Sequence, residues 1–258
     1  MIGKIKRVHH LNQLVFVFLL VLIVQFSVEF LPTPVEILKE AFTYLGDPDL
    51  RKNLMATAGR VYLSSFLALL LGITIGVADY FNSTISDMFN SIFYPTQFLS
   101  EAVLAILAIA VLGINPLVVY VITVISIVPD VFIATQEGLQ ELDKKILELG
   151  KVYAESRLKV FRHLVIPQVL PYIFIGGIRA HATAWDIVGT VEVFLALGGM
   201  GYLVQNQFRL LNLPELFALA IILISAGLIS DRILRIIKRQ IDRRYMHGDN
   251  EHQEFTRT

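Results

Sequence analysis

Long apolar runs alternate with short polar ones along this chain. A membrane-spanning helix needs about 20 mainly apolar residues, and six segments reach or approach that length. The third and fourth are short and are separated only by the turn-forming residues GINP, which favours a helical hairpin. The pattern therefore predicts an all-α polytopic membrane protein with six transmembrane helices: Leu14–Phe30, Thr57–Ala78, Phe98–Leu112, Leu117–Ala134, Val169–Leu197 and Leu216–Ser230.

Basic residues near the ends of these segments orient the chain in the membrane. Lys and Arg gather at residues 4–7, at residues 144–162 and at residues 232–244. Cytoplasmic flanks of spans are enriched in Lys and Arg, and six spans place all three regions on one side. We therefore expect cytoplasmic N- and C-termini. The predicted organisation is a cytoplasmic N-terminus (1–13), a six-span transmembrane domain (14–238) with a cytoplasmic loop (136–167), and a disordered cytoplasmic tail (239–258).

The segment between the first two spans carries a weaker pattern. Val35, Leu38, Phe42 and Leu45 recur at near-helical spacing. This spacing favours a short amphipathic helix lying at the outer membrane surface, and a solvated linker is the alternative.

Composition supports a membrane location and removes some kinds of chemistry. Of the 258 residues, 55% are hydrophobic and 17% are charged, whereas about a quarter of a typical soluble domain is charged. The formal net charge is zero, so no overall field attracts nucleic acid. The absence of cysteine excludes disulfides, thiolate metal sites and cysteine nucleophiles.

The cytoplasmic segment between the fourth and fifth spans is polar and basic, yet it keeps a helical apolar stripe. The stripe forms two short pieces with a bend between them, and basic residues lie between its members. A loop made basic only by topology would explain the charges but not the stripe. We therefore expect this segment to meet a partner protein or lipid headgroups. The stripe residues are Ile146, Leu149 and Tyr153, then Leu158, Phe161 and Val165.

This segment resembles the cytoplasmic signature loop of permease subunits in binding-protein-dependent ABC importers. The family pattern is Glu-Ala-Ala, three residues, Gly, nine residues, Ile, one residue, Leu-Pro. Glu148 matches its start, and Leu164, Ile166 and Pro167 match its end. The chain departs from the pattern at Ala154, which replaces the glycine, and at the two residues after Glu148, where Leu-Gly replaces Ala-Ala. A glycine tolerates positive φ in a sharp turn, so the local bend is left open.

Other segments resemble the same family in the same order. They are LPTP at residues 31–34, RVYLSSFLALLLGITIG in the second span, the pair Ala184-Trp185, Glu192, and GGMGY at residues 198–202. The similarity extends from Leu31 to Arg244 and is closest to the branch that moves nitrate, taurine and aliphatic sulfonates.

The resemblance implies a MetI-like ABC importer permease architecture in the inner (plasma) membrane. Such permeases work as pairs, here expected to be a homodimer in membrane lipid, with two ABC ATPase subunits inside and a solute-binding protein outside. The chain has no G-x-x-x-x-G-K-[ST] phosphate loop. We therefore expect it to be non-catalytic and to bind no cofactor, with ATP and Mg on the partner ATPase. The residues expected to couple to the ATPase are Glu148, Ala154, Arg157, Phe161, Arg162, Ile166 and Pro167.

The fifth span contains ionisable residues, which are costly in a membrane and usually face protein or water. Arg179 and Asp186 lie seven positions apart and share a helix face, and Trp185 and Glu192 share another. We expect these four to line the translocation path; the alternative is that they satisfy other helices of the bundle. His181 lies in the same span, where a packed, hydrogen-bonded histidine is favoured over a metal ligand.

Two other functions remain open from the sequence. A self-sufficient secondary carrier or channel would often show an internal repeat, paired broken helices or a filter. A polytopic membrane enzyme would gather acids or histidines near one interface. The sequence shows none of these patterns, and the permease is the favoured interpretation.

Overall fold

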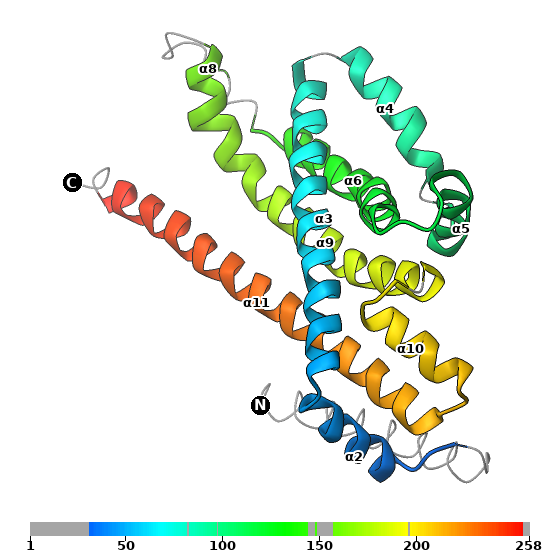
Figure 1. Ribbon diagram of the computed structural model, residues 1–258. Helices are drawn as coiled ribbons and strands as arrows, with labels where there is room; N and C mark the ends of the chain where they lie inside the picture. Colours follow the sequence, from blue (N-terminus) through cyan, green and yellow to red (C-terminus); the bar gives the residue numbers. More distant parts are fainter. Residues whose placement is uncertain are drawn as a thin grey trace.

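The computed structural model describes residues 31–81, 83–96, 98–143, 148, 157–195 and 197–254, and within them the regular structure is helical without a strand. This confirms the predicted all-α class. In chain order (Figure 1) the helices are α2 (Pro34–Leu45), α3 (Pro48–Phe81), α4 (Ser83–Thr96), α5 (Glu101–Leu112), α6 (Leu117–Gln140), α8 (Arg157–Val160) with the π-helical turn Phe161–Val165, α9 (Ile166–Leu195), α10 (Met200–Arg209) and α11 (Leu213–Glu254).

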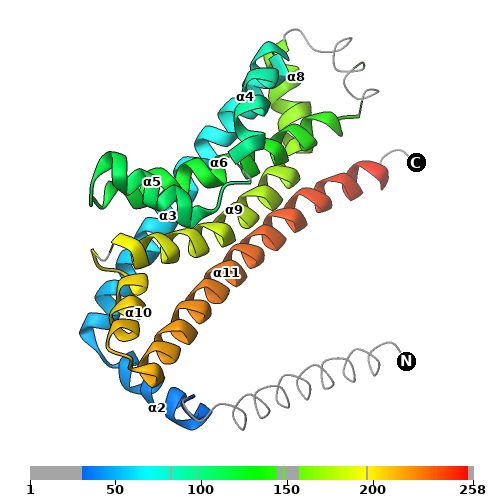
Figure 2. The ribbon, with the colours of Figure 1, turned by 90° about the vertical axis from the view of Figure 1, so that its right-hand side faces the viewer.

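Helices α3, α6 and α9 form the centre of the bundle. Their buried apolar side chains, among them Val61, Ile127 and Ile187, belong to one core cluster. α10 folds back from the end of α9, and α11 runs along α9 before its C-terminal half extends away (Figure 2). α2 lies across the end of the bundle where α3 and α11 begin.

The contact between α3 and α6 depends on two glycines one turn apart. A Cβ atom added to Gly72 would lie 2.6 Å from Val131 Cβ, and one added to Gly76 would lie 2.7 Å from Thr135 Cγ2. Small residues let helices approach closely where lipid gives no hydrophobic advantage to association. The structure thus identifies α6 as the helix that the glycine pair meets.

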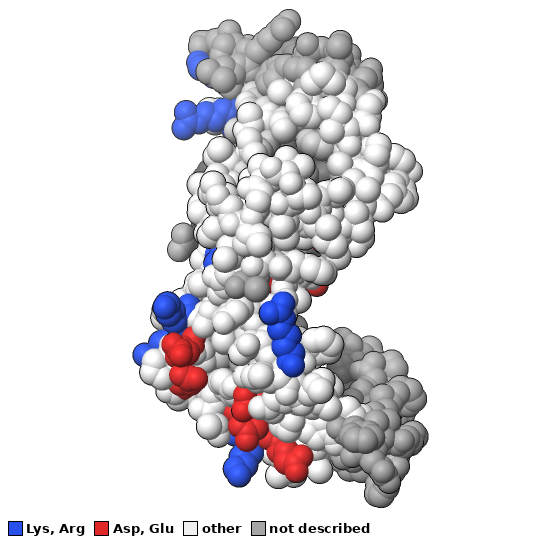
Figure 3. Space-filling model, turned by 45° about the vertical axis from the view of Figure 1, so that its right-hand side comes forward, with Lys and Arg blue, Asp and Glu red and all other residues white. Residues whose placement is uncertain are grey.

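Four segments are long and apolar enough to cross a membrane: Pro48–Ala78, Leu117–Gln140, Phe161–Leu195 and Leu213–Gln240. They correspond to the second, fourth, fifth and sixth predicted spans. The third predicted span is the 12-residue helix α5, and the first lies outside the described residues. On the face in Figure 3, the middle is largely white, whereas blue and red atoms mix near the lower end, where α2 and the start of α3 lie.

Three segments differ from the expectation. The stretch after the second predicted span contains a helix that was not predicted, α4, whose Phe93 and Phe89 rings lie 5.3 and 6.4 Å from the ring of Phe132 of α6. Helix α10 was not predicted. α11 continues to Glu254, through most of the residues expected to form a disordered tail, and no proline after Pro214 interrupts it.

The amphipathic helix predicted between the first two spans is present as α2. Thr33 and Glu36 form a reciprocal capping box at its start. The side chains of Val35 and Phe42 are 75% and 73% exposed, while Ala41 packs toward α11. The exposed apolar face fits the predicted location at the outer membrane surface, which stays a prediction.

Replacing Gly72 with Val should destabilise the bundle, because the new side chain would overlap Val131. Overpacking of this kind costs about 1–3 kcal/mol. The measurement is the thermal unfolding temperature of the purified chain in mild detergent. Gly59→Val is the matched control, since no atom lies within 4 Å of a Cβ at that position of the same helix. Equal unfolding temperatures for the two variants would contradict the assigned contact.

Candidate functional site

The predicted coupling segment joins the fifth span without a break. The N–H of Ile166 donates to the carbonyl of Phe161, five residues back, which makes Phe161–Val165 a π-helical turn. This wider turn directly precedes Pro167. A proline has no N–H, and its ring crowds the carbonyl four residues earlier, so a local π-turn accommodates it within a continuing helix.

One face of this segment holds it against the rest of the protein. Phe161, Val165 and Val169 pack against Leu139 and Leu142 at the end of α6. The predicted coupling residue Phe161 is therefore half-buried in an apolar cluster and anchors the segment.

The opposite face is exposed and forms the candidate coupling stripe, defined as Lys159, Arg162, His163 and Ile166. These positions follow the i, i+3, i+4, i+7 spacing of one helix face. Lys159 and His163 were missed from the sequence, although that spacing from Arg162 and Ile166 would have found them.

The remaining predicted coupling residues are Glu148, Ala154, Arg157 and Pro167. Pro167 and Glu148 are exposed. Ala154 lies outside the described residues, and the side chain of Arg157 is not among those described. The bend predicted between Tyr153 and Leu158 also lies outside them.

Near the other end of α9, Glu192 is fully buried and is held by α3. Its carboxylate accepts hydrogen bonds from Thr57 Oγ1 at 2.8 Å, from an Arg60 guanidinium nitrogen at 2.6 Å and from the Gly201 N–H at 3.1 Å. The same Arg60 nitrogen donates to the Gly198 carbonyl at 2.8 Å. Arg60 was missed from the sequence, although an arginine inside an apolar span is itself a signal.

The GGMGY loop fits closely around this carboxylate. Gly199 has φ +106°, and a Cβ there would lie 2.2 Å from the carboxylate carbon of Glu192. The Gly199 N–H donates to Asn53 Oδ1 at 2.7 Å, and the Met200 N–H donates to Thr57 Oγ1 at 2.8 Å. The loop is thus fixed to both α3 and α9. We call this group of contacts the Glu192 latch; it comprises Asn53, Thr57, Arg60, Glu192 and residues 198–201.

Midway along the bundle, a buried polar network joins α3, α9 and α11. His181 lies 3.1 Å from Ser65 through Nδ1 and 2.7 Å from Ser230 through Nε2, and Tyr62 lies 2.7 Å from Ser230. The indole N–H of Trp185 can only donate, so His181 Nε2, 3.2 Å away, is the acceptor. The ring proton is then on Nδ1 and is donated to Ser65, while Ser230 donates to Nε2 and accepts from Tyr62.

This arrangement gives His181 the structural role that was favoured from the sequence. Among the described residues no group of three His, Cys, Asp or Glu side chains is placed to hold a metal ion.

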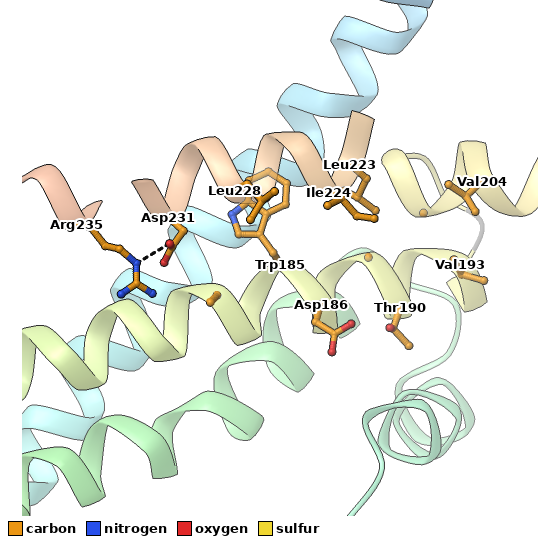
Figure 4. Close-up of a pocket in the computed structure, with 14 residues that line it drawn as sticks. Trp185, Asp186, Thr190, Val193, Val204, Leu223, Ile224, Leu228, Asp231 and Arg235 are labelled. Carbon is orange, nitrogen blue, oxygen red and sulfur yellow. Dashed lines mark hydrogen bonds and ion pairs between the residues drawn. The ribbon is translucent and has the colours of Figure 1, made fainter. Parts of the chain in front are cut away.

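A cavity of about 570 Å³ lies between α9, α10 and α11. Trp185 extends from α9 toward Leu228 of α11, and the ion pair of Arg235 with Asp231 lies at the end of the cavity away from Val204 (Figure 4). Asp186 also lines the cavity.

The four residues predicted for the translocation path are thus separated into three places. Trp185 and Asp186 line the cavity. Arg179 is exposed in a neighbouring groove lined by residues of α9 and α11. The carboxylate of Glu192 accepts hydrogen bonds from Thr57 and Arg60 of α3.

The model of the family described as "Binding-protein-dependent transport system inner membrane component" matches residues 68–244. This chain belongs to that family. The predicted family is confirmed, and the chain is a permease subunit of a binding-protein-dependent ABC importer, a multi-pass component of the inner membrane.

Curated relatives agree with the predicted branch. A probable ABC transporter permease protein of Brucella melitensis is 26% identical over 82% of this chain and 86% of its own length. The taurine transport system permease protein TauC of Escherichia coli is 24% identical over 82% and 79%. The nitrate import permease protein NrtB of Synechocystis is 22% identical over 81% and 79%.

Solved structures share the fold. An amino acid ABC transporter aligns with a TM-score of 0.63 at 15% identity over 76% of this permease and 94% of that chain. The MetNI methionine ABC transporter in an inward-facing conformation aligns with a TM-score of 0.57 at 17% identity over 73% and 96%. These alignments confirm the predicted MetI-like architecture.

Replacing Glu192 with Gln should destabilise the permease, because it leaves the charge of Arg60, whose side chain is only 12% exposed, without its carboxylate. Breaking a buried ion pair from one side costs about 3–5 kcal/mol. Thermal unfolding in detergent measures the loss. Arg235→Gln breaks the exposed pair with Asp231 and should change the unfolding temperature little, since exposed pairs contribute little. A Glu192→Gln protein as stable as the control would refute the latch.

Proposed function

We propose that this permease carries a small oxyanion along α9 and couples that movement to ATP hydrolysis on a separate ATPase through the loop of residues 141–167. One observation carries the proposal. The coupling stripe and the cavity-lining residues Trp185 and Asp186 lie on one uninterrupted helical segment that runs from Arg157 to Leu195.

A continuous helix gives the coupling a direct physical route. When ATP draws the two ATPase subunits together, a force on Arg162 and its neighbours would move the segment as a rigid body. The packing of Phe161 against α6 would carry α6 with it. The cavity beside α10 and α11 would then change its opening, which is alternating access.

The Glu192 latch would hold the C-terminal end of α9 in place during this movement. It ties the end of α9 to α3 and to the loop that leads into α10. In this proposal Glu192 acts on the path by holding its wall in place, while Trp185 and Asp186 face the solute.

The solute class rests on the relatives and on charge. The names of two relatives specify taurine and nitrate, and both compounds carry a negatively charged oxygen-bearing group. Arg179 is exposed near the middle of α9, where it can attract such a group. A homodimer, two ATPase subunits and an extracytoplasmic binding protein complete the proposed importer.

Replacing Arg162 with Glu should weaken attachment of the ATPase several-fold, because it reverses a charge in the exposed coupling stripe. The measurement is affinity purification of the tagged chain from its native membrane, with quantification of any co-purifying subunit that bears a phosphate loop. Lys39→Glu, an equal charge reversal on exposed α2, should leave recovery unchanged. Equal recovery of the ATPase by both variants would remove Arg162 from the interface.

Replacing Arg179 with Gln should lower uptake of an anionic solute about tenfold, because a hydrogen bond to a charged group is lost. Uptake of taurine and of nitrate is measured with the purified importer complex in vesicles. ATPase recovery should stay at the wild-type level, since Arg179 is remote in sequence from the coupling stripe. Unchanged uptake of a solute that the wild type transports would return Arg179 to a structural role.

A further inference from the structure

Trp185 is the only tryptophan among the 258 residues of the chain, and it lines the cavity between α9, α10 and α11. Its indole extends from α9 toward Leu228 of α11 (Figure 4). Tryptophan has one polar side-chain atom, the indole nitrogen, which can only donate a hydrogen bond. The group that accepts this hydrogen bond therefore has a direct influence on how the ring lies in the cavity wall.

Apolar packing alone leaves the orientation of this ring poorly determined. The backbone of α11 lies against it at Gly227, where an added Cβ atom would be 3.6 Å from Trp185 Cγ. This contact limits the distance between the ring and α11, but rotation about the last side-chain bond of an aromatic residue has broad energy minima. The hydrogen bond from the indole N–H to His181 Nε2, at 3.2 Å, supplies the missing constraint.

His181 is itself held on several sides, so it can act as a fixed reference for the ring. It precedes Trp185 by one helical turn of α9 and is only 2% exposed. Ser65 of α3 lies 3.1 Å from Nδ1, Ser230 of α11 lies 2.7 Å from Nε2, and the ring of Tyr62 lies 5.0 Å from the imidazole between centroids. Contacts from α3 and α11 thus lock the histidine, and the histidine in turn orients the indole.

The two ring nitrogens of His181 have separate tasks. Nδ1 binds α3, whereas Nε2 meets both α11 and the indole. A neutral imidazole has a single acceptor nitrogen, and Ser230 and Trp185 share it. Among the described residues, Nε2 is the acceptor that the indole N–H has, so its loss would leave this donor unpaired beside the cavity.

We propose that His181 is a positioning residue of the translocation path: by accepting the hydrogen bond of Trp185, it fixes the orientation of the indole and with it the shape of the cavity wall. The inference rests on the proposed function, in which Trp185 faces the solute. A side chain that contacts a ligand is precise only when its own rotamer is locked by packing and hydrogen bonds. His181 does not line the cavity and acts through Trp185.

The single tryptophan makes the state of this ring measurable. With excitation selective for tryptophan, acrylamide quenching of fluorescence reports how accessible Trp185 is in the purified full-length chain in mild detergent. The matched substitutions are His181→Asn and His181→Gln, which carry the same amide on side chains that differ by one methylene. The longer Gln reaches the position of Nε2 with a carbonyl oxygen that accepts from the indole N–H, whereas the shorter Asn ends near the position of Nδ1.

His181→Asn should increase the quenching and should lower solute uptake about fivefold, the effect of one lost hydrogen bond. His181→Gln should keep both values near the wild-type level. Uptake of taurine and of nitrate is measured with the purified importer complex in vesicles. Recovery of the ATPase should be equal for all variants, because His181 is buried and remote in sequence from the coupling stripe.

Tyr62→Phe is the control for a general weakening of the network. It removes the hydroxyl that lies 2.7 Å from Ser230 and keeps the aromatic ring beside His181. Its unfolding temperature should fall, while quenching and uptake should stay at the wild-type level. If His181→Asn does not fold, hydrogen exchange of the wild type takes its place. Isotope-labelled tryptophan gives a single indole N–H signal, which should exchange with heavy water far more slowly than that of free tryptophan.

The outcomes separate a positioning role from a merely structural one. Equal quenching of His181→Asn and His181→Gln, or fast exchange of the indole N–H, would overturn the inference. So would a Tyr62→Phe protein that is quenched as strongly as His181→Asn, or increased quenching of His181→Asn with normal uptake. Quenching and exchange need no transport, so a wild type that moves neither solute would count against the proposed function and not against the contact between His181 and Trp185.

Discussion

The continuity of one helix through the membrane is the constraint on which the rest of this permease depends. The helix that carries the fifth span contains Pro167 and Pro171 near its start, and a proline removes a backbone donor and crowds the preceding turn. The π-turn before Pro167 maintains helical hydrogen bonding where a normal turn would crowd the proline ring. As a result, the exposed candidate coupling stripe and part of the wall of the cavity between α9, α10 and α11 belong to one continuous helical element.

That element is held by polar contacts as much as by apolar packing. Lipid gives no hydrophobic advantage to helix association, so close contacts and interhelical hydrogen bonds contribute more of the specificity. The Glu192 latch fixes α9 to α3 and to the loop before α10, and the His181 network joins α3, α9 and α11 at mid-height. α9 is thereby fixed to its neighbours at several points along its length, as the proposed coupling requires.

Much of the architecture could be predicted before the structure. The apolar runs identified four spans that the structure contains, and the GINP turn identified the hairpin of α5 and α6, where Gly113 has φ +75°. The residue pattern of the signature loop indicated the family, and the family match confirmed it. Helix α10 and the helical state of α4 were missed, because a short amphipathic helix whose partner is unknown cannot be distinguished from a polar loop by its pattern alone.

The sequence by itself determined the fold class, the family and the apolar stripe to which Phe161 and Val165 belong, because these follow from local periodicity and from residues adjacent in the chain. Only the tertiary structure decided which ionisable groups face each other. Glu192 looked like a path residue until Thr57 and Arg60, 135 and 132 positions away, were found on its carboxylate. Arg179 and Arg239 share a groove for the same reason. Contacts between distant positions depend on how helices pack, and helix packing leaves no periodic signal in a single chain.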